Sequence, residues 1–207
     1  MAKNLVRIAK AVRSGSKDAV LRDFCMDDEV RKAFKENVTR KSGRDFWYWK
    51  DKPQMEFGVV ETLLEAAEFD VADLTARADD PPDCEALVNG VHCGIEATEL
   101  VHQKALKRSV SGDQELHFVW DKQSLCTELQ ARIARKDRGA ANAKGGPYQR
   151  YILVMYTDEL FLDRLSVERF LSDASFRATF ITDAFLGLSY DPSIGNCPIF
   201  RLRLSRE

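Results

Sequence analysis

The sequence lacks long hydrophobic runs, and its cysteines show no pattern typical of a metal site or a disulfide framework. No apolar segment approaches the roughly 20 residues that a membrane-spanning helix needs, so no membrane partner is expected. The five cysteines include no Cys-x-x-Cys pair, and none is spaced with histidine as in zinc sites. Reduced core thiols in a cytoplasmic protein are therefore expected.

Also absent are a basic net charge, a secretion signal and a nucleotide-binding loop. The 207 residues carry a formal net charge of −2, with an isoelectric point of about 6.0. Composition alone therefore does not indicate nucleic-acid binding, although an acidic metal site would offset local basic patches. The start of the chain, residues 1–3, leads into a segment of mixed charge, which is not expected of a signal peptide. The glycines of residues 139–146 do not match the pattern G-x-x-x-x-G-K-[ST].

What the sequence does contain is a strong hairpin signal in residues 82–100. Asn89 and Gly90 separate two runs in which apolar residues alternate. A two-residue turn needs a positive φ at both of its positions, and Asn-Gly is the pair that best allows it. A turn this tight places Val88 opposite Val91 and fixes the pairing of every other residue in the two strands.

The same register places Asp83 opposite Glu96, and strand alternation sorts the other side chains onto two faces. One face is wholly apolar and is expected in the core: Cys84, Ala86, Val88, Val91, Cys93, Ile95 and Ala97. Two facing carboxylates repel each other. A bound Mg²⁺ (or Mn²⁺) would relieve that repulsion, because carboxylate oxygens are preferred ligands of such ions. An amphipathic hairpin with its polar face in water remains the alternative.

The rest of the chain predicts an α/β domain over residues 53–207, with a mixed central sheet flanked by helices. Residues 1–52 predict an N-terminal helical extension. This extension ends in an aromatic and basic cluster, residues 45–50, which suits either packing against the domain or contact with nucleic acid. The predicted helices of the domain are 54–69, 122–137 and 167–171, the last capped by Ser166, and the predicted strands besides the hairpin are 69–74, 115–120, 151–156, 185–190 and 199–204.

The helix expected over residues 122–137 has an apolar stripe that ends in a lysine. Leu125, Leu129 and Ile133 recur at helical spacing, and Lys136 continues the same stripe. A lysine in this place usually extends to water along the apolar surface. It could equally point into a site at the edge of the sheet.

Pro82-Asp83 followed on the next strand by Glu96-x-Thr98 resembles the motif of the PD-(D/E)xK nuclease superfamily, which has the restriction-endonuclease-like fold. The order of a helix carrying glutamates, a hairpin, a second helix and an apolar strand is also similar to the core of that family. The resemblance covers roughly residues 54–158. It implies a metal-dependent nuclease that hydrolyses phosphodiester bonds of DNA.

In this resemblance, Asp83, Glu96 and the main-chain carbonyl of Ala97 would bind Mg²⁺ or Mn²⁺. The sequence departs from the family at Thr98, which stands where the motif has lysine and would serve as a hydrogen-bonding partner. Some family members supply the lysine from a neighbouring helix, and Lys136 is the first candidate for this role.

Other residues are alternatives or bystanders. Lys104 is the second candidate for the catalytic lysine. A glutamate of the preceding helix often joins the site in this family, and Glu61 is preferred here over Glu56, although spacing does not separate them. Glu85 and Glu99 are expected to lie outside the site.

Two further expectations concern partners and the rival function. A homodimer is expected if the protein cuts both DNA strands, as many members of the family do. The alternative is a catalytically inactive nuclease-like domain that binds nucleic acid or a protein partner. An unrelated α/β domain with a chance Pro-Asp pair is a third possibility.

Overall fold

The computed structural model describes residues 38–40, 47–49, 52–79, 81–102, 119–159, 161–191 and 193–206. Three helices lie in these ranges: α4 (Lys52–Ala66), α6 (Lys122–Ala140) and α7 (Arg164–Leu171). The main strands are β3 (Val71–Ala76), β4 (Cys84–Val88), β5 (Val91–Glu99), β6 (Arg150–Thr157), β8 (Asp183–Leu188) and β9 (Ile199–Leu202). Lys104 and residues 115–118 of the strand predicted over 115–120 lie outside the described residues, and residues 119–120 are not in a strand.

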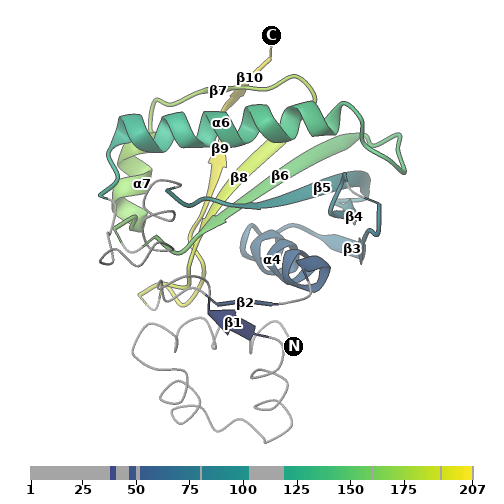
Figure 1. Cartoon of the computed structure of the whole chain (residues 1–207), viewed down its shortest axis with the longest axis horizontal. Coiled ribbons are helices and arrows are strands. Elements are labelled where there is room, and N and C mark those ends of the chain that lie inside the picture. Colours follow the sequence, from purple (N-terminus) through teal and green to yellow (C-terminus); the bar gives the residue numbers. More distant parts are fainter. Residues whose placement is uncertain are drawn as a thin grey trace, which may run out of the picture.

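These strands form one mixed sheet of six in the order β3-β4-β5-β6-β8-β9. The pairs β3/β4, β4/β5 and β8/β9 are antiparallel, whereas β5/β6 and β6/β8 are parallel. Helix α6 crosses one face and α4 lies against the other (Figure 1). The predicted α/β class, a mixed sheet flanked by helices, is therefore confirmed. Strand β9 forms one edge of this sheet.

Each face of the sheet has its own apolar core. On one face, Val60, Leu63 and Leu64 of α4 pack against the apolar face predicted for the hairpin. On the other face, the predicted stripe of α6 is fully buried. The central strand β6 contributes to both cores, with Ile152 in the first and Leu153 in the second. A strand covered on both faces needs apolar residues throughout, which explains its near-continuous hydrophobic run.

The ends of all three helices differ from the prediction, and α4 begins two residues and ends three residues before the expected range 54–69. Asp121 caps α6 as its side chain accepts the Ser124 N–H, and the helix runs past the expected end at residue 137 to Ala140. The cap of α7 is Asp163, so the prediction of Ser166 is wrong. Ser166 instead lies inside the first turn and donates its hydroxyl to Asp163.

The described part of the N-terminal extension is not helical. Strands β1 (Val38–Arg40) and β2 (Trp47–Trp49) form an antiparallel pair, and β2 contacts α4. Alternating valine, threonine and aromatic residues favour strands over helices, which explains this difference from the prediction. The remaining residues of the extension lie outside the described ranges. Two short strands that the sequence did not predict, β7 (Phe176–Arg177) and β10 (Leu204–Ser205), pair in parallel.

None of the helices in the described ranges is long and apolar enough to cross a bilayer.

Candidate functional site

The hairpin brings two carboxylates together across its open end. Asn89 and Gly90 have φ values of 51° and 73°, and Val88 pairs with Val91, as the tight turn requires. Strand β4 begins one residue after Asp83, whose Oδ2 accepts the main-chain N–H of Ala97 at 2.8 Å. This hydrogen bond fixes Asp83 beside the strand that carries Glu96, as the predicted register implied.

Helix α6 places Lys136 between these two carboxylates. Its Nζ forms an ion pair with Oε2 of Glu96 and lies 3.6 Å from Oδ2 of Asp83. Two placements were left open for Lys136, extension to water and a site at the edge of the sheet, and the structure shows the second. The side chain keeps 20% of its surface exposed, so the Nζ lies at the mouth of the site. We refer to Asp83, Glu96 and Lys136 as the acid–lysine cluster.

Helix α6 lies along β5, and the two elements run in opposite directions. Arg132 donates to the carbonyl of Val101, and Arg135 donates to Oγ1 of Thr98 at 3.2 Å. Lys136 then meets Glu96, two residues earlier in the strand. Thr98 therefore lies beside the acid–lysine cluster, as predicted, but its hydroxyl contacts Arg135.

Burial makes Glu96 an unusual carboxylate. Its exposed fraction is 1%. Burial raises its pKa, and the charge of Asp83 adds to that effect, while Lys136 and a hydrogen bond from Tyr151 Oη at 3.0 Å act in the opposite direction. Burial beside Glu96 also raises the pKa of Tyr151 far above its ordinary value, so the phenol stays a donor. Tyr151 was not singled out from the sequence.

The raised pKa of Glu96 gives a prediction for stability. The Glu96 carboxyl group holds its proton more tightly in the folded state than in the unfolded state. Its contribution to the free energy of unfolding is therefore fully present below the ordinary glutamate pKa, and it is lost as pH rises through the raised pKa. Relative to the unmodified protein, Glu96→Gln is therefore expected to gain stability progressively as pH rises across this range. Urea unfolding at a series of pH values, without metal, measures the difference.

The matched control for that measurement is Glu85→Gln. Glu85 lies on the same face of the hairpin but is half-buried and paired with Arg77 at 2.6 Å. Its substitution should give no increasing gain in stability across the same pH range. A stability difference between Glu96→Gln and the unmodified protein that does not change with pH would contradict the prediction.

The two glutamates considered on α4 differ in burial. Glu61 is exposed, whereas Glu56 has only 7% of its surface exposed. The reason is helical spacing, because Glu56 precedes the buried residues Val60 and Leu63 by four and seven positions. The choice between the two as a residue of the site stays a prediction.

A second polar network, centred on Glu85, flanks the acid–lysine cluster. Glu85 accepts from Arg77 and from Tyr148 Oη, at 2.6 and 3.2 Å, and the ring of Tyr148 lies edge-on to that of Tyr151. A Cβ at Gly94 would stand 3.0 Å from both rings, so glycine makes the room that Tyr151 uses to reach the site. Glu85 is thus engaged elsewhere, as predicted for a bystander.

The donor set of the acid–lysine cluster suits a hard cation only in part. Asp83, Glu96 and the carbonyl of Ala97 are oxygen donors of the type that Mg²⁺ prefers. Mg²⁺ usually keeps several waters and takes only one or two carboxylates, so these oxygens could supply the protein's share of its ligands. Among the described residues, no group of three or more His, Cys, Asp or Glu side chains could hold a metal ion. A cation would therefore rely on the main chain, water or substrate for its other ligands.

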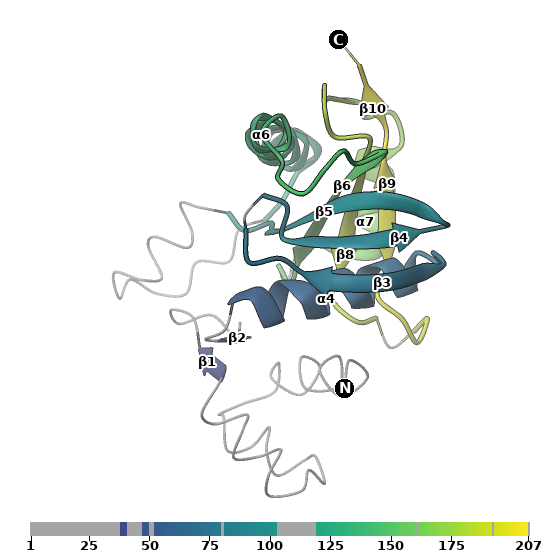
Figure 2. The same cartoon turned by 90° about the vertical axis from the view of Figure 1, so that its right-hand side faces the viewer.

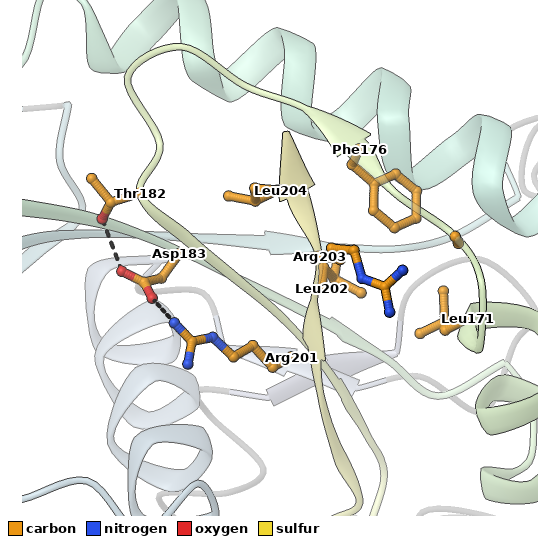
Figure 3. A pocket seen from close by; sticks show the side chains of 9 residues that line it. Leu171, Phe176, Thr182, Asp183, Arg201, Leu202, Arg203 and Leu204 are labelled. Atoms are coloured by element: carbon orange, nitrogen blue, oxygen red, sulfur yellow. Dashed lines mark hydrogen bonds and ion pairs between the residues drawn. The ribbon is translucent and has the colours of Figure 1, made fainter. Parts of the chain in front are cut away.

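A separate hollow of about 400 Å³ lies near the start of β8 (Figure 3). The buried carboxylate of Asp183 lies at its edge and accepts from Arg150, Arg201 and the hydroxyl of Thr182, at 3.0, 2.7 and 2.9 Å. The carboxylate joins β8 to the neighbouring strands β6 and β9, which carry the two arginines. Its partners fully explain its burial, so we assign it a structural role.

Asp183→Asn is expected to lower the free energy of unfolding by roughly 1–3 kcal/mol, because the buried side chain keeps only part of its hydrogen bonds and two arginines lose the charge that pairs them. Chemical denaturation measures this change. Asp173→Asn is the matched control, since Asp173 pairs with Lys122 at an exposed position and should matter far less. Equal losses in the two variants would show that Asp183 does not hold the strands together.

Comparisons of the chain with protein-family models, with curated proteins and with solved structures find no match. The function must therefore be argued from the acid–lysine cluster itself.

Proposed function

We propose that this protein is a metal-dependent nuclease that hydrolyses phosphodiester bonds of DNA through the acid–lysine cluster. The observation that carries the proposal is the contact of Lys136 with both Asp83 and Glu96. Thr98 occupies the usual lysine position of the motif. A lysine delivered to the same carboxylates from α6 supplies the missing group.

The arrangement of the elements supports this proposal. The chain runs α4-β3-β4-β5-α6-β6, with β3, β4 and β5 antiparallel and β6 parallel to β5. This is the order of helix, hairpin, helix and buried strand on which the resemblance to the PD-(D/E)xK nucleases rests. Figure 2 shows β3, β4 and β5 side by side at this edge of the sheet. We infer a restriction-endonuclease-like core for this part of the chain.

Each group of the site has a chemical task in this proposal. Asp83, Glu96 and the Ala97 carbonyl would hold Mg²⁺, which supplies charge stabilisation at the phosphoryl oxygens and a lower pKa for a bound water. Tyr151 keeps Glu96 oriented through its hydrogen bond. Lys136 orients the attacking water or stabilises the charge that develops at phosphorus. Glu56, buried on α4, is the helix glutamate assigned to support the site.

The direct test is incubation of the full chain with plasmid DNA and with single-stranded DNA, with Mg²⁺ or Mn²⁺. Cleavage that needs the metal and stops on addition of a chelator is expected. The binding of the metal can be followed independently as a rise in melting temperature, which does not depend on turnover. Absence of cleavage on both substrates with either metal would overturn the proposal.

One observation favours the second candidate, a nuclease-like domain that binds without cutting. Lys136 is engaged by both carboxylates, so a metal ion must compete with an internal ion pair. If the ion pair is more stable than the metal complex, no metal ion binds to the two carboxylates. A melting temperature that does not respond to Mg²⁺ or Mn²⁺, together with retained DNA binding, would identify this inactive form.

A further inference from the structure

Arg135 stands next to Lys136 on α6 and turns toward the same strand. Its guanidinium donates one hydrogen bond to Thr98 Oγ1, at 3.2 Å, and the side chain is exposed. A guanidinium has five N–H donors. Within the described part of the chain, the hydroxyl of Thr98 is the one hydrogen-bond acceptor found for it. Most of its donors therefore face solvent beside the acid–lysine cluster.

Arg132, one turn earlier, shows what a structural arginine looks like on this helix. It is 8% exposed, donates to the Val101 carbonyl and lies 3.9 Å from Glu128. Burial lowers its pKa, and the positive charge of Arg135 lowers it further. Arg135 thus repels its neighbour without a carboxylate partner in the described residues. Such repulsion does not stabilise the fold, but a bound anion would relieve it.

The charge of the site points to the kind of anion. When Asp83 and Glu96 are both ionised, their charge exceeds that of Lys136, so the cluster alone repels a phosphodiester. A second cation beside the cluster offsets that repulsion. Arginine suits this task, because its planar fork matches the oxygens of a phosphate in two parallel hydrogen bonds.

Thr98 positions the guanidinium group of Arg135. It occurs two residues after Glu96, hence on the same face of β5, and its hydroxyl is the acceptor that holds the guanidinium against the strand. The motif position normally held by lysine would then serve to orient Arg135. A valine at this position keeps the β-branched shape but loses the acceptor.

We propose that Arg135 binds a phosphate of the nucleic-acid backbone beside the acid–lysine cluster, and that Thr98 is its positioning residue. The proposal rests on the proposed function for the identity of the substrate. Because the contact is to phosphate, it contributes to affinity for DNA of any sequence and carries no base specificity. It also gives binding a measurable dependence on salt.

The test measures binding apart from cleavage. Fluorescence anisotropy of the full chain with labelled single-stranded and double-stranded oligonucleotides is recorded in chelator, between about 50 and 200 mM salt. Arg135→Ala is expected to weaken binding about tenfold and to reduce the slope of log affinity against log salt by about 1. Arg135→Lys should retain that slope, because the charge remains. Thr98→Val should weaken binding less than Arg135→Ala, and Thr98→Ser should restore it.

Arg169→Ala is the matched control, since Arg169 is an exposed arginine of α7, outside the acid–lysine cluster. It removes the same charge and should leave the salt slope unchanged. An equal loss in Arg135→Ala and Arg169→Ala would overturn the proposal, as would an unchanged slope in Arg135→Ala. If the unmodified protein cleaves DNA with metal and Arg135→Ala is equally active, the inference about Arg135 is rejected and the proposed nuclease function stands. If the protein does not cleave DNA but its DNA binding depends on Arg135, only the proposed nuclease function is rejected. If the protein does not bind DNA at all, the inference about Arg135 is rejected.

Discussion

Asp83→Asn is expected to reduce the rate of metal-dependent DNA cleavage by roughly 10²- to 10³-fold. Asparagine retains an oxygen that can accept the Ala97 N–H, so the hairpin should keep its structure. What the variant loses is the negative charge that holds a cation against the phosphate. Initial rates on plasmid DNA, with a full titration of Mg²⁺, give the effect.

The same variant has a second readout that does not depend on catalysis. The rise in melting temperature caused by Mg²⁺ should shrink or vanish in Asp83→Asn. Glu85→Gln is the control, because Glu85 is a hairpin carboxylate already engaged by Arg77 and Tyr148. It should retain both the cleavage rate and the metal-induced stabilisation. Cleavage by Asp83→Asn within a few-fold of the unmodified protein would place the active site elsewhere.

Lys136→Ala is expected to lower the cleavage rate by roughly 10²-fold and, in the opposite direction, to tighten the binding of Mg²⁺. The two effects have one cause. Lys136 assists the chemistry, yet in the absence of metal its Nζ occupies Oε2 of Glu96 and stands close to Asp83. Removal of the lysine therefore frees the carboxylates for a cation.

Rates and metal affinity should be measured on the same preparation of Lys136→Ala, with affinity taken from titration calorimetry. Lys122→Ala provides the control on the same helix, because Lys122 pairs with Asp173 at the opposite end of α6. It should change neither quantity. Full activity in Lys136→Ala would show that another group assists the reaction, and unchanged metal affinity would show that the ion pair does not compete.

Much of the fold could be predicted because local patterns and long-range packing agree. The Asn89-Gly90 turn has one favoured geometry, so the register of the hairpin follows from two residues. The apolar run of β6 indicated a strand covered on both faces, and it has that position. The short strands β7 and β10 were missed because two residues carry no periodic pattern.

The candidate site was predictable where spacing along one element decides position. Strand pairing brought Asp83 to Glu96, and the helical stripe carried Lys136 toward the sheet. Glu56 and Glu61 show the limit, since both lie on α4 and only packing against the sheet exposes one of them. Tyr151 belongs to a strand distant in sequence, and no pattern in its own segment indicates a contact with Glu96.

The sequence by itself determined the hairpin register, the α/β class, the buried stripe of α6 and the residue types of the acid–lysine cluster. These depend on interactions between near neighbours in the chain, whose geometry is set by the backbone. Only the tertiary structure decided that Lys136 reaches both carboxylates and that Thr98 holds Arg135. Those contacts depend on how α6 lies along β5, and that placement is set by the packing of the whole core.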